Sequence, residues 1–78
     1  LSGGILQLSL TREILIDVMH NRGTTSNQIQ HRLRNHPTPV VKSHIEILVE
    51  SGHLHKRGNT FLDISQVGMK YLIPNRRP

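Results

Sequence analysis

The stretch "GHLHKRGNTFLDIS", residues 52–65, decides the fold of this chain. Apolar residues recur there at alternate positions on both sides of a Gly58-Asn59 pair, namely Leu54, Leu62 and Ile64. Two alternating runs around a glycine-containing turn predict a β-hairpin. Because Lys56 and Arg57 come directly before the turn, we expect the tip of the hairpin to be positively charged.

The register of this hairpin follows from the same alternation. A two-residue loop would place Leu54 opposite Asp63 and divide the apolar residues between two faces. A loop with an odd number of residues, such as 57–59, keeps them on one face and sets Leu54 opposite Leu62. We therefore expect an odd loop. The outer face of the hairpin then carries His55, Phe61 and Asp63.

Three helical segments are predicted before the hairpin. Each has apolar residues at the spacing of one helix face. These faces are Leu10, Ile14, Leu15, Val18 and Met19 in the first segment, Ile29 and Leu33 in the second, and Val41, Ile45, Leu48 and Val49 in the third. A short fourth helix is expected after Ser65, with Val67, Tyr71 and Leu72 as its anchors and Pro74 as its end.

The ends of these helices carry recognisable stop and start residues. Gly23 and Gly52 fit the left-handed position that ends the first and third helices. Thr25 followed by Gln28 is a capping-box pattern at the start of the second helix, which Pro37 closes. For the third helix, we expect Thr38 as the N-cap and Pro39 at the first helical position.

Length and composition indicate one small domain. Seventy-eight residues leave no room for a second core, and the absence of Cys rules out disulfides and thiolate metal sites. No apolar run is long enough to cross a membrane, and no signal peptide is evident. We expect residues 1–9 to be a flexible arm or linker, residues 10–73 to be the domain, and residues 74–78 to be a basic tail of a piece from a longer protein.

The charge of the chain is segregated along the sequence. The formal net charge is +5, and no acid occurs from Val18 to Ile45 or from Ser51 to Leu62. One positive face is expected from this pattern, which favours a polyanionic partner such as nucleic acid. A basic surface that only improves solubility is the alternative. Glu46 and Glu50 weigh against a nucleic-acid partner, because both lie in the third helix.

The third helix and the segments after it share a pattern with a known family. The pattern is Val41-x3-Ile45-x2-Leu48-x3-Gly52-x-Leu54, followed by a basic hairpin and "DISQVGMKYL". It resembles the winged-helix regulators of the MarR and ArsR type, in which an "L-T-x-x-G-x-x-x-L" segment follows the second strand of the wing. Ile64, Ser65, Gly68 and Leu72 stand in that segment's places, and the resemblance covers residues 10–73.

The resemblance implies a fold and a function. The fold would be mainly α with a small β-hairpin (α+β): a three-helix bundle, a hairpin wing and a short C-terminal helix. The function would be DNA binding in transcription regulation, with a recognition helix at 38–51 in the major groove and a wing at 53–64 on the phosphate backbone.

The resemblance also assigns candidate contacts with double-stranded DNA. Those of the recognition helix are Thr38, Lys42, Ser43 and, on its flank, His44. Those of the wing are Lys56, Arg57 and Asn59, and those of the second helix are Thr25, Ser26, Arg32 and Arg34. Several have a structural alternative: Thr25 and Thr38 suit helix caps, and Lys42 could pair with Glu46 at the i, i+4 spacing.

The competing interpretation is a winged-helix domain that binds another protein in a transcription, replication or other assembly. The apolar residues Val40, Ile47 and Phe61, with Ile5, Leu6 and Leu8 in the arm, would serve that role. We expect no enzyme, because no catalytic constellation or phosphate loop is visible. We likewise expect no metal among the six histidines, no cofactor, no small-molecule site, no membrane association, and a location inside the cell, on the nucleoid or in the nucleus.

A single winged domain would present one recognition helix, whereas specific sites usually need two half-sites. We therefore predict that the full-length protein is a homodimer and that this chain alone is a monomer or a weak dimer through residues 1–10. Sedimentation should show a monomer, or a dimer that dissociates when residues 1–8 are deleted. A tight dimer that survives the deletion would exclude the arm as the interface.

Overall fold

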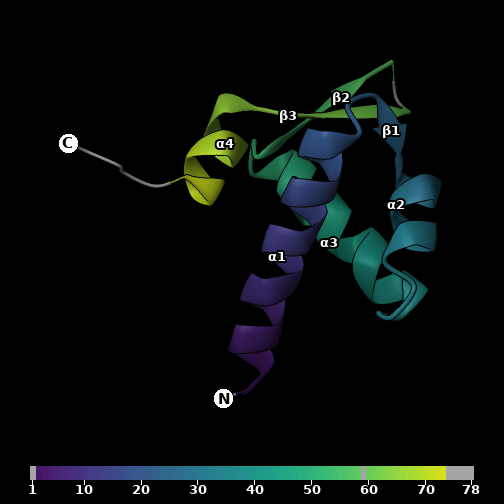
Figure 1. Ribbon diagram of the computed structural model, residues 1–78, viewed down its shortest axis with the longest axis vertical. Coiled ribbons are helices and arrows are strands. Elements are labelled where there is room, and N and C mark those ends of the chain that lie inside the picture. The colour runs from purple at the N-terminus through teal and green to yellow at the C-terminus, as the bar shows by residue number, and fades with distance from the viewer. Residues whose placement is uncertain (1, 59, 74–78) are drawn as a thin grey trace.

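The computed structural model describes residues 2–58 and 60–73 (Figure 1). This part of the chain is a mainly α, α+β domain of four helices and a three-stranded antiparallel sheet. The elements, in chain order, are α1 (Ser2–His20), β1 (Thr24–Thr25), α2 (Ser26–Arg32), α3 (Thr38–Glu50), β2 (Leu54–Arg57), β3 (Phe61–Ile64) and α4 (Gln66–Leu72).

The core lies between α1, α2, α3 and the inner face of the sheet. Its buried apolar residues are Leu10, Ile14, Leu15, Val18, Ile29, Val41, Ile45, Leu48, Leu54 and Leu62. They belong to the apolar faces predicted for the three helices and to the even-numbered face of the hairpin. Leu33 and Val49 are half-buried against this core, as is Ile64 of the hairpin.

The helix starts differ in how well the sequence predicted them. At α2 the capping box is confirmed, because the Gln28 amide N–H donates to Thr25 Oγ1 and the Thr25 N–H donates to the Gln28 side chain. At α3 the prediction is wrong by one residue. Pro37 is the N-cap, and its carbonyl accepts the N–H groups of Val40 and Val41. Thr38 is therefore already helical and caps nothing.

The hairpin has the expected odd loop, at a different position. Three residues separate Arg57 at the end of β2 from Phe61 at the start of β3. Leu54 therefore pairs with Ile64 and not with Leu62, and Lys56 lies opposite Leu62. The shift has a backbone cause. The first residue of the loop has a positive φ, which is +61° at Gly58. If the loop began at Arg57, as predicted, that residue would be strained in this conformation.

A third strand, which the sequence analysis missed, completes the sheet. The strand order is β1-β3-β2, with Thr24 opposite Leu62 and Thr25 opposite Phe61. The Gly23 N–H also donates to the Leu62 carbonyl at 2.9 Å. The central strand is therefore β3, and β1 fixes the start of α2 to the hairpin.

The turn that follows α3 has the hydrogen bonds of a Schellman motif. Gly52 has a φ of +87°, its N–H donates to the Val49 carbonyl, and the His53 N–H donates to the Leu48 carbonyl. This confirms Gly52 as the residue that ends the helix. The turn also reverses the chain, so that the hairpin packs back against α3.

The short helix α4 begins as predicted, and two of its three predicted anchors, Tyr71 and Leu72, pack against the core. Ser65 caps it by accepting the Gly68 N–H at 3.1 Å. Gly68 is buried, and an added Cβ would lie 2.4 Å from the His53 carbonyl oxygen. Because this close approach places Gly68 and Tyr71 on the packed face, Val67 is 49% exposed and is not an anchor.

The first helix begins earlier than the sequence predicted. The expected arm at 1–9 is helical from Ser2, because α1 continues eight residues before the predicted start at Leu10. These turns project beyond the other helices (Figure 1). The predicted tail at 74–78 lies outside the described residues.

Leu48→Ala should lower the free energy of unfolding by about 2–5 kcal/mol, because Leu48 is only 4% exposed and its truncation leaves a cavity. Ile47→Ala is the matched control, since Ile47 is the preceding residue and is 57% exposed. Urea unfolding of both variants measures the difference. Equal effects of the two substitutions would contradict the assigned packing of α3.

Candidate nucleic-acid interface

The outward side of α3 is polar over most of its length. Val41, Ile45 and Leu48 face the core, so the residues half a turn away face outward. The exposed polar residues of this helix are Thr38, Lys42, Ser43, Glu46 and Glu50. The part of the helix before Glu46 carries a cation and two hydroxyl groups and no acid, which is the composition expected for contacts with an anion.

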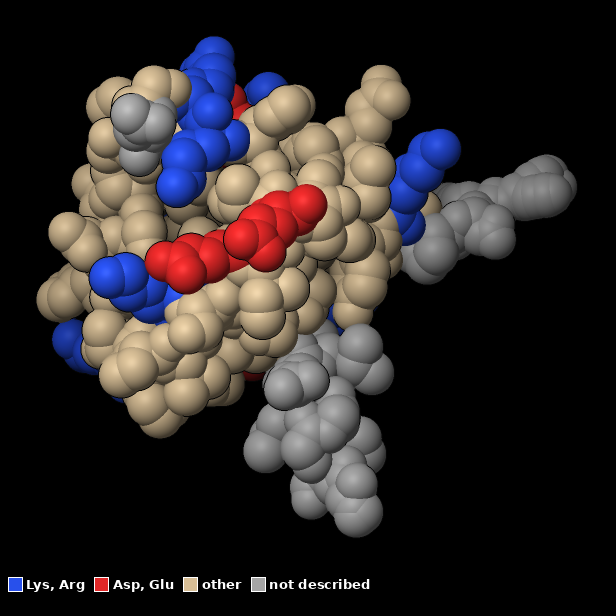
Figure 2. All heavy atoms as spheres, turned by 180° about the vertical axis from the view of Figure 1, so that it is seen from behind, with Lys and Arg blue, Asp and Glu red and all other residues tan. Residues whose placement is uncertain are grey.

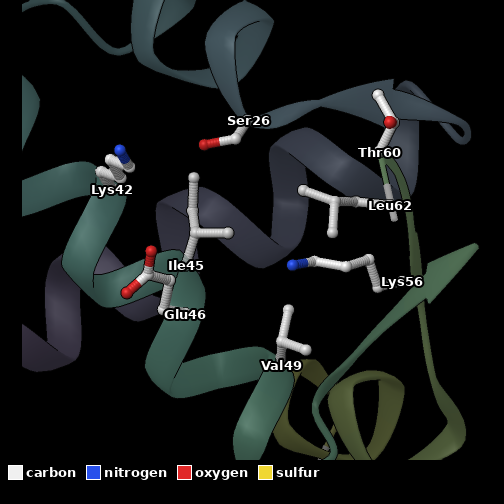
Figure 3. Close-up of a pocket in the computed structure, with 8 residues that line it drawn as sticks. All are labelled: Ser26, Lys42, Ile45, Glu46, Val49, Lys56, Thr60 and Leu62. Atoms are coloured by element: carbon white, nitrogen blue, oxygen red, sulfur yellow. The ribbon is translucent and has the colours of Figure 1, made fainter. Parts of the chain in front are cut away.

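A surface hollow lies between α3, the start of α2 and the hairpin. The residues that line this α3–hairpin hollow are Ser26, Lys42, Ile45, Glu46, Val49, Lys56, Thr60 and Leu62 (Figure 3). Its volume of about 160 Å³ is below the roughly 300–1,000 Å³ of small-molecule pockets. A hollow of this size suits a protruding group, such as a phosphate or a side chain.

Lys56 reaches this hollow because of the hairpin register. It lies opposite Leu62, on the inner face of the hairpin. Its side chain extends from β2 between Leu62 and Val49, with the amine directed toward α3 (Figure 3). A lysine often lays its methylene groups on apolar surface and keeps the ammonium in water. Here that geometry brings a second cation to the side of α3 that carries Lys42.

Acidic side chains also lie on this side of the molecule. Figure 2 shows an acidic band with basic groups on both sides of it. The acids of α3 are Glu46 and Glu50, both exposed and one turn apart. Among the described residues, no ion pair joins Lys42 or Lys56 to Glu46. The expected alternative in which Lys42 is occupied by Glu46 is therefore not the arrangement in the structure.

Arg57 is held by an acid on the neighbouring strand. Its Nε donates to Asp63 Oδ2 at 2.9 Å, while 69% of the Arg57 side chain stays exposed. The Asp63 carboxylate also accepts the Gly23 N–H at 3.0 Å and lies 3.9 Å from Arg22 Nε. Asp63 thus ties the hairpin to the segment before β1 and fixes the direction of the Arg57 guanidinium.

Arg32 faces away from the hollow and has a structural role. It forms a bidentate salt bridge with Asp17 of α1, in which the shortest N–O distance is 2.7 Å. It also donates to Thr24 Oγ1 at 2.6 Å. The hydrogen bond to Asp17 raises the pKa of Arg32, while burial works in the opposite direction. This network joins α1, β1 and α2.

The other predicted contacts have varied positions. Ser26 lies at the hollow, where its Oγ accepts a hydrogen bond from Gln30. Thr25 is the cap of α2, and Arg34 is exposed in the connection between α2 and α3. Asn59 lies outside the described residues. The structure therefore brings together Ser26, Lys42 and Lys56 from the set that the sequence predicted.

The histidines are partly explained by packing contacts. His53 donates to or accepts from Ser51 Oγ at 2.6 Å and packs edge-on against Tyr71 at 5.8 Å. His36 lies 2.9 Å from Glu13. Within residues 2–58 and 60–73, no three His, Asp or Glu side chains gather as a possible metal-ligand set. No helix in that part of the chain is long and apolar enough to cross a membrane.

His44 is part of the α1–α3 contact, at the edge of the exposed surface of α3. It is half-buried, and its Nε2 lies 2.5 Å from Thr11 Oγ1 on α1. Burial lowers the pKa of His44 below its ordinary value of 6.5, because desolvation disfavours the charged imidazolium. Protonation of His44 is therefore less favourable in the folded protein than in the unfolded chain.

This shift predicts a pH dependence of stability. A lowered folded-state pKa means that the unfolded chain binds the proton more readily, so the His44 contribution is complete above about pH 6.5 and declines as the pH falls. His44→Gln should reduce the loss of thermal stability between about pH 7.5 and about pH 5.5. The other five histidines are present in both the wild-type protein and the His44→Gln variant, so they contribute equally to both pH profiles. An identical loss in both would show that His44 does not contribute.

Comparison with known proteins gave no assignment for this chain. No protein-family model, curated protein or solved structure matched it significantly. A fold alone does not fix a function. The geometry of α3, the hairpin and the hollow between them is therefore the evidence for one.

Proposed function

We propose that this domain is a winged helix-turn-helix module that binds double-stranded DNA. In this proposal α3 (Thr38–Glu50) is the recognition helix in the major groove, and the β2–β3 hairpin is the wing on the phosphate backbone. The cell compartment would be the one that holds the DNA, and the role would be in transcription regulation.

The order of the elements supports the fold part of the proposal. A helix, a short strand and two helices are followed by a hairpin, and the first strand joins the hairpin in the order β1-β3-β2. The resemblance to the MarR and ArsR regulators implies the three-helix bundle, the wing and the short C-terminal helix. In such an arrangement the third helix and the hairpin are exposed on the same side.

One observation carries the function: Lys42 of α3 and Lys56 of β2 line the same hollow, and the start of α3 carries no acid. Two cations from separate elements suit a backbone phosphate, at Lys56, and the acceptors of a neighbouring base, at Lys42. The Ser26 hydroxyl, at the start of α2, lies at the same hollow and can add a hydrogen bond. A phosphate in the hollow would meet Lys56 and Ser26, and Lys42 would face the edge of the neighbouring base.

Arg57 would make its phosphate contact without leaving Asp63. The ion pair uses Nε, and most of the guanidinium side chain is exposed. Because Asp63 restricts the side chain before binding, less conformational freedom is lost when a phosphate is contacted. Arg57 is thus a contact to the backbone in this proposal, while Lys42 and Ser43 are the groups placed to meet base edges.

A protein-binding module is the second candidate, favoured by the opposite flank of α3. Val40 is 49% exposed and Ile47 is 57% exposed, and both line a shallow surface depression with Pro39, Ser43 and His44. This apolar flank would suit a partner protein. The Lys42–Lys56 pair on the other flank has no use in that interpretation, which is why DNA is preferred.

Fluorescence titration with random duplex DNA tests the proposal. The logarithm of the affinity should fall linearly with the logarithm of the salt concentration, with a slope of about −0.9 for each phosphate neutralised. Lys56→Ala should weaken binding and reduce the slope by about 1, as expected for a phosphate contact. Lys70→Ala is the matched control, because Lys70 is an exposed lysine on α4, outside the hollow.

Two results would contradict the proposal. The first is the absence of duplex binding at about 50 mM salt, where electrostatic binding is strong. The second is an equal effect of Lys70→Ala and Lys56→Ala, which would mean that only net charge matters. The first result would favour the protein-binding alternative through the Val40 and Ile47 flank, and the second would remove the hollow as the DNA contact.

A further inference from the structure

We propose that Glu46 is a specificity determinant that accepts a hydrogen bond from the exocyclic amine of a cytosine. This inference rests on the proposed function and refines it, because it names the kind of DNA sequence that α3 would prefer. Glu46 would make the domain select a cytosine close to a guanine contacted by Lys42. It accounts for an acid on a surface that otherwise suits an anion.

Glu46 lies on the outward side of α3. It faces away from the core residues Val41, Ile45 and Leu48, and it is exposed. It also lines the α3–hairpin hollow together with Lys42 (Figure 3). A helix lying in the major groove along its outward side would direct Glu46 at base edges and leave the phosphates to the flanking cations.

The carboxylate is available for such a contact. Among the described residues, neither Lys42 nor Lys56 forms an ion pair with Glu46, although both line the same hollow. An ionised carboxylate can only accept hydrogen bonds. In the major groove, cytosine presents an amine donor, while guanine presents only acceptors there. Glu46 therefore favours cytosine and disfavours guanine at the position it meets.

The spacing of the two base contacts, by Lys42 and Glu46, follows from the geometry of an α-helix. Lys42 and Glu46 are four residues apart, so their Cβ atoms lie about 5–6 Å from each other. Stacked bases are about 3.4 Å apart along a strand. A lysine suits the two acceptors of guanine. The preferred sites should therefore contain a guanine and a cytosine within about two base-pair steps.

A selection from a duplex library with randomised central positions tests this inference. The wild-type domain should enrich cytosine at one position near an enriched guanine. Glu46→Gln should change that position to adenine, because a Gln amide pairs with the amine and ring nitrogen of adenine. Titration of the two selected duplexes should show a preference of about five- to tenfold that reverses in the variant.

Glu50→Gln is the matched control. It removes the same charge from the same helix one turn later, so any general gain in affinity is common to both variants. The control should keep the cytosine preference. Circular dichroism checks that both variants retain the helical content of the wild-type protein.

The outcomes separate the inference from the proposed function. Duplex binding with no base preference, or a Glu46→Gln variant that gains affinity for all sequences alike, would overturn the role of Glu46 and leave DNA binding intact. A cytosine preference that also disappears in Glu50→Gln would overturn the assignment to Glu46. Failure of every protein to retain duplex DNA would overturn the proposed function itself.

Discussion

The turn at Ser51–His53 is the constraint on which the arrangement of the domain depends. Gly52 adopts a left-handed conformation that ends α3, and its carbonyl accepts the Ser65 hydroxyl. The His53 carbonyl accepts the Ser65 N–H and lies against the backbone of Gly68. One three-residue turn therefore joins the end of α3, the end of the hairpin and α4. A residue with a Cβ would be strained at Gly52 and would collide at Gly68.

This turn also determines the geometry of the candidate interface. It directs the chain so that Leu54, the residue after the turn, enters the core. Side chains alternate along a strand, so Lys56 lies on the same inner face as Leu54. The position of Lys56 beside α3 is thus a consequence of core packing. The outer face of the hairpin is fixed separately, by the Asp63 carboxylate and its bonds to Gly23 and Arg57. Two independent restraints hold the two basic residues of the hairpin.

Periodicity and capping patterns in the sequence predicted the helices, the core and the parity of the hairpin. They failed where the deciding contact is distant in the chain or where the signal is short. The two residues of β1 are too few to show a periodicity. The N-cap of α3 is Pro37 and not Thr38, because both residues are compatible with a helix start. Among the candidate contacts, Lys42 and Lys56 lie at one hollow. Arg32 is taken up by Asp17, fifteen residues away, which no local pattern reveals.

The exposed acids of α3 have a consequence for competition within a genome. Random DNA attracts a basic domain mainly through its phosphates, and a genome offers a vast excess of such sites. Carboxylates at Glu46 and Glu50 weaken that attraction wherever no amine donor meets them. In the proposed function, the domain would therefore spend less time bound at random positions. A small module with modest affinity would gain occupancy of its own target by being released sooner from all the others.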